Sequence, residues 1–541
     1  MKRNKMERNN RKADALVVGE TLGLELEMGV VDKKNGESRC VTDAYFARLA
    51  DIKRQRGEDV ERETLEDPDS RTARTVNLSS PLGDSGLDNG FNLLETSFSP
   101  VREDEGGLDV LAARVHQELR DVLAALAADG LTLLNASEHP AHAPDLAWYR
   151  QAKVPRPIYR DWLEYRQWQH FIGMDAKAQN GPCVSIDIHH AARALNVTLA
   201  LAPAFIALFA NSPLAAGKET GLKEHRLTLW EAMFAKARFP GDLRLCRLPA
   251  RPFEELGDYF RWMFGAGTVS QAMPLASDGR PEAKKGYKSA PAFFLEGDPA
   301  LETFLHSASW AGWRGDRSRL VDILPHSAHF VHAQFAHFLD ARWRYTLDTL
   351  PDLGALLAAW QEPGGIEDLF SRHGVKGYIE VRAPGSVLPD FSLMEEAGPA
   401  VAATTPLSAA ALQLGLLRNL ARAEALVQSR GWNNLRALRP RAIQFALEDD
   451  EVAALAADTL AVARAGLDAK EARWLAYADY ALKTRRTAAD RMLCLWRKHA
   501  SLEKLAAQRA IRLPESNFFA KGHPQNANIK RDDERGALPF H

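Results

Sequence analysis

The chain has 541 residues, 46% of them hydrophobic and 26% charged, so it can bury a sizeable core without a disulfide or a structural metal. Its 69 Lys and Arg nearly balance 71 Asp and Glu, and a formal net charge of −2 argues against a large nucleic-acid-binding surface. Four cysteines occur without a CxxC pair, which argues against zinc ribbons and a secreted disulfide framework.

The N-terminus is basic and has no apolar run behind it. A secretory signal needs such a run, so residues 1–13 predict a disordered tail instead. Two later stretches without charge, residues 194–217 and 397–417, raise the question of a membrane span. The first is interrupted by prolines and suits a buried helix, and the second is too weakly apolar to insert. We expect a cytoplasmic protein that binds neither membrane nor nucleic acid.

The first part of the chain alternates between strand and helix patterns. Residues 15–28 predict a half-buried strand, because Leu24, Glu25, Leu26 and Glu27 alternate strictly. The elements expected next are a helix over residues 43–57, a polar loop over 58–90, a strand over 91–98 and an amphipathic helix over 108–128.

The remainder of the chain becomes progressively more helical. The elements expected there are a strand over residues 183–188, a buried helix with its apolar part at 197–210, a loop over 265–291 and a strand over 378–382. Helical periodicity dominates from Pro406 to about residue 512. This order predicts an α+β fold with a main domain over residues 14–405, a helical region over 406–513 and a polar tail over 514–541.

Several sequence motifs resemble known phosphate-binding or metal-binding motifs but lack residues that those motifs require. Residues 211–219 (NSPLAAGKE) resemble a phosphate-binding loop only at Gly217 and Lys218, and Glu219 stands where a Ser or Thr hydroxyl should meet Mg²⁺. Four histidines gather in a predicted helix, namely His326, His329, His332 and His337. No Cys or Glu lies at ligand spacing from them, so solvated or packed histidines are favoured over a zinc site.

Carboxylates on predicted strands are the informative feature. Glu25 and Glu27 are two residues apart, so a strand places both on one face, and Glu380 and Arg382 repeat this spacing. Each pair alone also fits a surface strand edge or a surface ion pair. Several strands with acids on one sheet face would, however, suit a magnesium site, because Mg²⁺ binds through carboxylates, water and substrate phosphates.

Four motifs then occur in a fixed order along the chain. They are GLELEM at residues 23–28, DNGFNLLETSFSP at 88–100, ALFANSPLAAGKETGLKEHRLTLW at 207–230 and YIEVR at 378–382. Over roughly residues 15–420 this order resembles the glutamate–cysteine ligase superfamily of carboxylate–amine ligases, in particular its plant and proteobacterial branch. The resemblance implies a glutamine-synthetase-like antiparallel sheet with the active site on one face, flanked by helices.

The resemblance also implies a reaction and a set of site residues. ATP would phosphorylate the γ-carboxylate of glutamate, and an amine, with cysteine the leading acceptor, would attack the γ-glutamyl phosphate. The implied Mg²⁺ ligands are Glu25, Glu27, Asp88, Glu95 and Glu380. Arg382 and Arg226 would bind the transferring phosphoryl group, with Trp230 near the substrate. The alternatives are another amine acceptor, a non-catalytic homologue, and a zinc hydrolase that uses the histidine cluster.

One position departs from the family pattern. Asp187 stands where the family has His or Gln, and a continued strand would place Asp187 and His189 on one face. This predicts that Asp187 adds a sixth carboxylate to the metal site and that His189 contacts nucleotide or metal.

Overall fold

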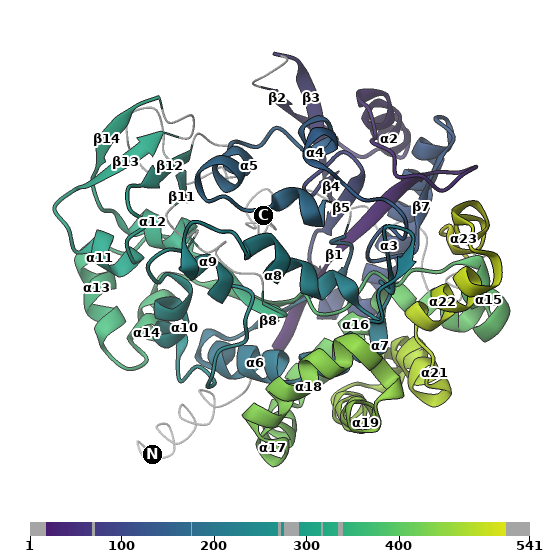
Figure 1. Ribbon diagram of the computed structural model, residues 1–541. Coiled ribbons are helices and arrows are strands. Elements are labelled where there is room, and N and C mark those ends of the chain that lie inside the picture. The colour runs from purple at the N-terminus through teal and green to yellow at the C-terminus, as the bar shows by residue number, and fades with distance from the viewer. Residues whose placement is uncertain are drawn as a thin grey trace.

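The computed structural model describes residues 18–67, 71–174, 176–268, 272–274, 292–314, 318–333 and 339–514. The basic N-terminal tail, the tail after Pro514, His337 and most of the loop expected over residues 265–291 lie outside these residues. Within the described part, helices surround one large sheet (Figure 1).

The large sheet is antiparallel and is built around β1 (Val18–Asp32), its longest strand. Its strand order is β15-β16-β8-β1-β5-β4-β3-β2, and the short strands β6 and β7 pair with opposite ends of β1. The bounds of the other strands are β2 Glu61–Glu66, β3 Ala73–Ser80, β4 Gly83–Leu87, β5 Leu93–Phe98, β6 Val101–Arg102, β7 Leu131–Leu134, β8 Asn180–Ile186, β15 Ala341–Thr346 and β16 Lys376–Val381. The predicted α+β class with an antiparallel sheet is confirmed.

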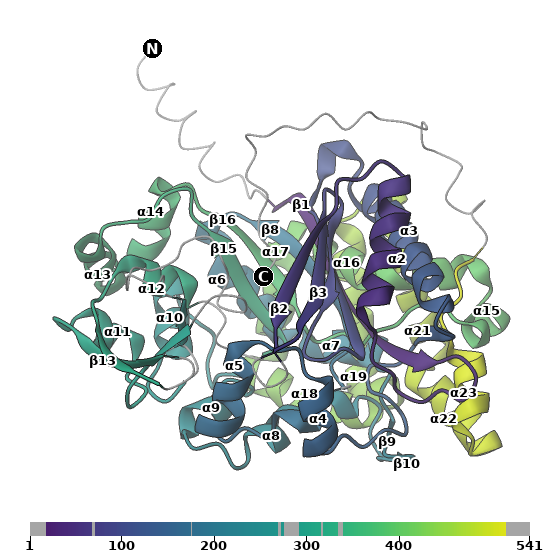
Figure 2. The ribbon, with the colours of Figure 1, turned by 90° about the horizontal axis from the view of Figure 1, so that it is seen from above.

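Alternation along β1 separates an apolar face from a charged face. Leu24, Leu26 and Met28 are buried on the first face, and strands of this sheet are covered by α3 (Gly107–Ala127) and α16 (Pro399–Arg418). Because successive strand side chains point to opposite faces, Glu25 and Glu27 point away from Leu24, Leu26 and Met28. Figure 2 shows α16, α2 (Asp43–Gln55) and α3 lying alongside the sheet.

Both uncharged stretches of the sequence are core helices. Helix α16 is apolar and long enough to cross a membrane, but 89% of its most apolar window is buried inside the protein. The other stretch forms two helices, α6 (Ile188–Ala200) and α7 (Ala202–Phe209), which meet at a bend of 48°. The single buried helix predicted here is therefore wrong, and Pro203 in the first turn of α7 favours a new helix start.

The prediction of a polar loop over residues 58–90 is also wrong. Strands β2, β3 and β4 occupy most of it and form the outer part of the sheet. The edge strand β2 is largely solvent-exposed, so its residues need not be apolar, whereas Val76 and Leu78 of β3 are buried. At the other end of the sheet, β8 stops at Ile186, before the predicted end of the strand.

A smaller lobe and the C-terminal helices lie on opposite sides of the molecule (Figure 1). The lobe contains the four-stranded sheet β11 Ala272–Pro274, β12 Ala292–Leu295, β13 Trp310–Arg314 and β14 Leu320–Ile323, with α10 Leu256–Met263, α11 Leu301–Leu305, α12 Ser327–His332, α13 Leu353–Gln361 and α14 Gly365–Arg372. The C-terminal helices are α17 Leu420–Arg430, α18 Trp432–Phe445, α19 Asp450–Ala465, α20 Ala469–Ala472, α21 Ala476–Thr484, α22 Ala488–His499 and α23 Leu502–Arg509. Helix α16 runs through residue 406, where the sequence predicts the helical region to begin.

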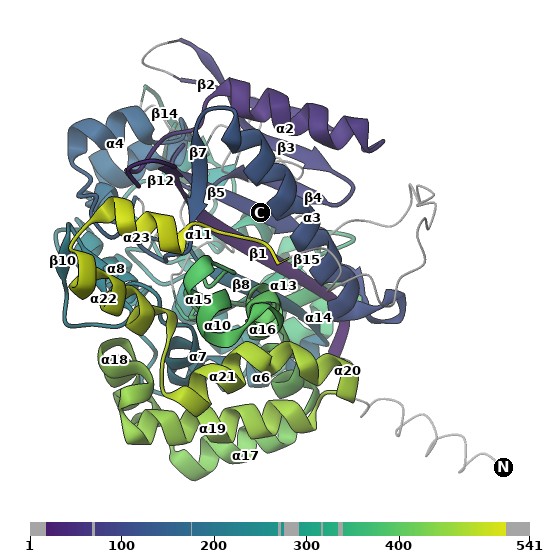
Figure 3. The same cartoon turned by 90° about the vertical axis from the view of Figure 1, so that its right-hand side faces the viewer.

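A buried arginine fastens α23 to distant parts of the chain. Arg509 of α23 forms an ion pair with Asp390 at 2.9 Å and donates to the Asn135 carbonyl at 2.7 Å. It also donates to Asn211 Oδ1 at 2.5 Å, and the Asn211 amide donates to the Ser386 carbonyl at 2.6 Å. Asn211 of the NSP motif therefore helps to join four distant segments, and Figure 3 shows α23 beside β7 and α15 (Phe391–Ala397).

We expect Arg509→Met to lower the free energy of unfolding by about 3–5 kcal/mol, because it leaves the fully buried Asp390 without its ion-pair partner. The matched control is Arg497→Met, which removes a solvent-exposed ion pair with Glu219 and should cost less than about 1 kcal/mol. Urea denaturation of both variants measures the difference. Equal losses would contradict the role assigned to Arg509.

Candidate active site

Strands β1, β5 and β16 bring carboxylates onto one face of the sheet, and β8 lies between β1 and β16. Glu27 of β1 lies opposite Glu95 of β5 in the strand register. On the other side of β1, Cys183 of β8 lies opposite both Gly23 and Glu380. Directly opposed residues share a face, so the face of Glu25 and Glu27 also carries Glu95 and Glu380.

Burial and mutual repulsion perturb the acids on β1. Glu25 and Glu27 are 6% and 5% exposed. Burial, followed by the charges of Glu380 and Glu95, raises the pKa of Glu25 from 4.5 to about 8. Burial and the charges of Asp88 and Glu95 hold the pKa of Glu27 well above its usual range. Asp88, which follows β4, therefore lies close to the β1 acids, and a cation would relieve the repulsion among these groups.

One oxygen of the Glu27 carboxylate has no hydrogen-bond partner among the described residues. Its Oε1 accepts a hydrogen bond from the Gln179 amide at 3.3 Å, while Oε2 is buried and has no hydrogen-bond partner. In the part of the chain that the structure describes, no group of three or more His, Cys, Asp or Glu side chains is arranged to hold a metal by itself. The free oxygen of Glu27 could serve as a ligand of a hard cation such as Mg²⁺, which uses one or two carboxylates and completes its shell with water and substrate phosphates.

Arginines dominate the other half of the same face. The Glu380 carboxylate accepts from Arg342 Nε at 2.7 Å and from Arg382 Nη1 at 2.8 Å, and Arg344 Nε lies 3.9 Å away. Burial alone would raise the pKa of Glu380, but the three guanidinium groups outweigh burial and hold this pKa well below its usual range. The face is therefore polarised, with acids around β1 and arginines on β15 and β16.

Sequence reasoning missed Arg342 and Arg344. The segment ARWRYT at residues 341–346 alternates charged and aromatic residues, which is the period-two signal of a strand with one polar face. The sequence also gave no indication of Gln179, because its position opposite β1 depends on the pairing of β8 with β1.

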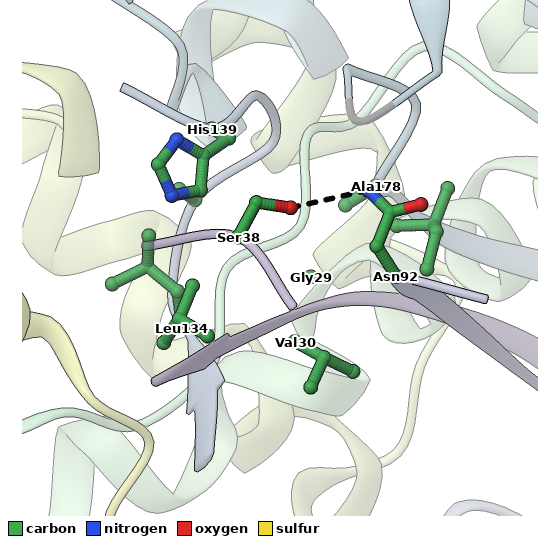
Figure 4. A pocket seen from close by; sticks show the side chains of 10 residues that line it. Gly29, Val30, Ser38, Asn92, Leu134, His139 and Ala178 are labelled. Atoms are coloured by element: carbon green, nitrogen blue, oxygen red, sulfur yellow. Dashed lines mark hydrogen bonds between the residues drawn. The ribbon is translucent and has the colours of Figure 1, made fainter. Parts of the chain in front are cut away.

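A small pocket lies beside Gly29 of β1, two residues after Glu27 (Figure 4). Gly29 lines this pocket together with Ser38, Asn92 and His139, and the Asn92 amide donates to Ser38 Oγ at 3.3 Å. The cavity volume is about 10 Å³, which is room for about one water molecule. The pocket is too small for an amino acid or a nucleotide.

The prediction that Asp187 and His189 continue the strand face is wrong. Asp187 is the N-cap of α6, and its Oδ1 accepts from the His189 backbone N–H at 2.9 Å. His189 lies exposed in the first helical turn. Asp187 follows Cys183 by four residues, or about 13 Å along a strand, and so lies well away from the row of Glu25 and Glu380. The short polar side chain ends the strand because it caps a helix.

Arg226 contacts the backbone at the end of the charged face, whereas Trp230 packs within a helix. Arg226 Nε donates to Glu224 at 2.8 Å, and its Nη2 donates to the Ala383 carbonyl at 3.1 Å. It therefore supports the backbone just after Arg382. Trp230 of α8 (Leu229–Phe234) is buried, and Lys177 Nζ lies 4.9 Å from the centre of its ring.

Two of the clustered histidines cap a helix. His326 Nδ1 accepts from the Ala328 N–H at 3.0 Å, and His329 Nδ1 accepts from the His326 N–H at 3.1 Å. Burial, with smaller effects from His326 and His332, lowers the pKa of His329 to about 3. These contacts favour a structural role for His326 and His329 over a zinc centre.

Part of the chain matches the model of a known protein family. Residues 21–247 match Glutamate-cysteine ligase family 2 (GCS2). The match includes Glu25, Glu27, Asp88, Glu95 and Arg226, confirms the resemblance to glutamate–cysteine ligases and supports a carboxylate–amine ligase. None of the curated proteins matches the sequence.

Two solved structures are similar over most of the chain at low sequence identity. A glutamate–cysteine ligase from Francisella tularensis in complex with AMP is 14% identical, with 93% of this chain and 92% of that chain covered and a TM-score of 0.45. A bifunctional glutathione synthetase from Pasteurella multocida is 13% identical, with 91% of this chain and 51% of that chain covered and a TM-score of 0.37. The chain thus spans about half the length of the Pasteurella multocida protein.

Without metal, we expect the stability of the protein to fall between about pH 4.5 and about pH 8 because of Glu25. The folded state raises the pKa of Glu25 from 4.5 to about 8, so folding favours the protonated form. That contribution is complete below pH 4.5 and is lost as the pH rises through 8. The melting temperature of wild type relative to Glu25→Gln should therefore decrease with rising pH in EDTA. Glu37→Gln, at an exposed position, is the control, and a pH-independent difference for Glu25→Gln would count against the burial argument.

The two halves of the face should respond oppositely to loss of a carboxylate charge. Glu380→Gln removes the buried anion that binds the buried guanidinium of Arg342 and the partly exposed guanidinium of Arg382, and it should cost about 3–5 kcal/mol of unfolding free energy. Glu27→Gln relieves repulsion among acids and should leave metal-free stability unchanged or higher. Urea denaturation in EDTA compares the two, and a larger loss for Glu27→Gln would be inconsistent with a polarised face.

Proposed function

We propose that this protein joins the γ-carboxylate of glutamate to an amine at the expense of ATP, through a γ-glutamyl phosphate. A carboxylate anion is a poor electrophile, so it needs a leaving group before an amine can attack. One γ-carboxylate oxygen would attack the γ-phosphorus of ATP and release ADP. The amine nitrogen would then attack the carbonyl carbon, lose a proton and release phosphate. The observation that carries the proposal is the single sheet face on which buried acids adjoin buried arginines.

The acids around β1 are proposed to bind Mg²⁺, which would neutralise the negative charge of the ATP phosphates. Glu27 is best suited, because one of its oxygens is buried without a hydrogen bond, and Glu25, Asp88 and Glu95 lie around it. Glu380 was expected to be a further ligand. Both of its oxygens already accept hydrogen bonds from arginines, so we assign it to positioning Arg342 and Arg382 instead.

Arg382 is proposed to contact the transferring phosphoryl group. Its guanidinium is partly exposed and directed toward Glu380 on the charged face. A planar guanidinium can hold two oxygens at once, which suits a phosphoryl group in transfer. Arg226 is a positioning residue for this end of β16, because it binds the Ala383 carbonyl. Trp230 is assigned to packing against Phe234, with their ring centres 6.4 Å apart.

Cysteine is the proposed acceptor, which would make the reaction the first step of glutathione-type thiol synthesis in the cytoplasm. The second candidate acceptor is another amino acid or amine, since the family match is to glutamate–cysteine ligases while acceptor pockets are commonly built from variable loops.

A coupled assay of ADP release tests the reaction. We expect ADP to form only when Mg²⁺, glutamate and one member of a panel of amines, including cysteine, are all present. Glu27→Gln should abolish turnover while the protein stays folded, because it removes a ligand charge without core volume. If no amine raised ADP release above the Glu27→Gln background, the ligase assignment would be lost.

Arg382→Lys tests the role of the guanidinium. Lysine keeps the charge and loses the two-pronged geometry, so we expect kcat to fall by a few hundred-fold, or about 3–4 kcal/mol. Arg102→Lys is the control, because Arg102 forms an exposed ion pair with Asp104 and should leave kcat unchanged. An Arg382→Lys enzyme with normal kcat would show that Arg382 serves only as an ion-pair partner.

A further inference from the structure

Two arginines are buried together where the C-terminal helices meet the segment after β16. Arg491 of α22 and Arg509 of α23 are 2% and 0% exposed. They interact electrostatically with each other and with Asp390, the N-cap residue of α15, and Figure 3 shows α22 and α23 beside α15. This junction shares no residue with the charged sheet face.

Arg509 uses only part of its hydrogen-bonding capacity. In the described part of the chain it donates through Nη2 alone, to the Asn135 carbonyl and to Asn211 Oδ1. Its Nη1 lies 2.9 Å from Asp390 Oδ2 without forming a hydrogen bond, and its Nε is buried and has no partner. The outer edge of this guanidinium therefore lacks an acceptor.

Arg491 has fewer partners still. Among the described residues it donates a single hydrogen bond, from Nη2 to the Tyr477 hydroxyl at 3.4 Å, and its Nε and Nη1 are buried without a partner. Its guanidinium carbon lies 5.9 Å from the centre of the Tyr477 ring. No carboxylate in the described residues forms an ion pair with Arg491. Its charge is therefore buried without a direct counterion.

An arginine of equal burial elsewhere in the protein is fully paired. Arg166 is also 2% exposed. Asp242 accepts from its Nε at 2.9 Å and from its Nη2 at 2.7 Å, and Asp298 accepts from its Nη1. All three nitrogens of Arg166 thus reach a carboxylate, which is the arrangement expected of a buried guanidinium.

Asp390 cannot compensate both guanidinium groups at the junction. Its Oδ1 accepts from the Ser392 hydroxyl at 2.9 Å and from the Leu393 N–H at 2.7 Å. Its Oδ2 accepts from the Asn135 amide at 2.6 Å and pairs with Arg509. This carboxylate therefore has its acceptor sites occupied and supplies one negative charge.

The other acid that influences Arg491 is Glu396, and it is bound elsewhere. Its Oε1 accepts from the Tyr480 hydroxyl at 2.6 Å and lies 3.1 Å from Arg486 Nη1, in a partly exposed ion pair. Two buried guanidinium groups thus share one buried carboxylate among the described residues.

We propose that Arg491 and Arg509 bind a small monovalent anion, of the size of chloride, at this junction. One such anion would balance the second positive charge and accept hydrogen bonds from the unpaired N–H groups. The near-complete burial of both side chains favours a small ion over a metabolite. Since an unpaired buried charge is costly, the anion should stabilise the folded protein.

Thermal unfolding of the full-length protein in sodium chloride and in sodium gluconate tests the proposal. At equal concentration the two salts screen surface charges equally, and gluconate is too bulky for a buried site. Arg491→Met removes one guanidinium and keeps an unbranched side chain. Arg497→Met is the matched control on the same helix, because its ion pair with Glu219 is solvent-exposed.

We expect wild type and Arg497→Met to melt at a higher temperature in chloride than in gluconate. The melting temperature should rise by about 1 °C for each tenfold increase in chloride above the dissociation constant. Arg491→Met should lose this dependence, because Asp390 balances the remaining guanidinium. Equal melting temperatures of wild type in both salts, or an undiminished chloride effect in Arg491→Met, would overturn the proposal.

Arg491→Lys keeps the test decisive if Arg491→Met does not fold. Lysine keeps the positive charge but loses the fork of donors, so the same rise in melting temperature should need roughly tenfold more chloride. The chloride-35 NMR line, broadened by exchange with the site in wild type, should sharpen in the lysine variant. An unchanged chloride requirement and line width in Arg491→Lys would count against the site.

Discussion

Buried charges of opposite sign on one sheet face are the constraint around which this protein is organised. A buried carboxylate is costly unless a cation or hydrogen bonds compensate it. Hydrogen bonds from Arg342 and Arg382 compensate the charge of Glu380. Glu25 and Glu27, in contrast, lie close to other acids, and their pKa values are raised. The protein therefore compensates the buried carboxylate in one half of the face with arginines, whereas the acids in the other half repel one another.

Such a face needs a rigid scaffold, since small shifts would change every electrostatic interaction on it. The opposite face of β1 supplies apolar burial through Leu24, Leu26 and Met28. At the margin, Arg226 fixes the backbone after Arg382, and Arg509 connects the last helix to Asn135 and Asn211. The LFANSP segment therefore has a structural role. Its Asn211 links Arg509 of the last helix to the backbone of Ser386, which follows β16.

The sequence predicted the parts of the site that lie within single strands. Alternation alone placed Glu25 beside Glu27 and Glu380 beside Arg382, and the order of the motifs indicated the family. Alternation could not give the strand register, so it could not bring Glu95 opposite Glu27 or Arg342 opposite Glu380. It failed at Asp187, because a helix N-cap and one more strand residue look alike in sequence. It also failed over β2 to β4, where an outer sheet region tolerates polar residues.

Isotope transfer tests the central claim most directly. Glutamate labelled with oxygen-18 in its γ-carboxylate would be incubated with ATP, Mg²⁺ and the amine that supports ADP release, and the phosphate product examined by mass spectrometry. If a γ-glutamyl phosphate forms, one labelled carboxylate oxygen leaves with the phosphate, so each phosphate produced should carry one oxygen-18. Unlabelled phosphate, released together with ADP, would mean that the carboxylate is never phosphorylated and would contradict the account.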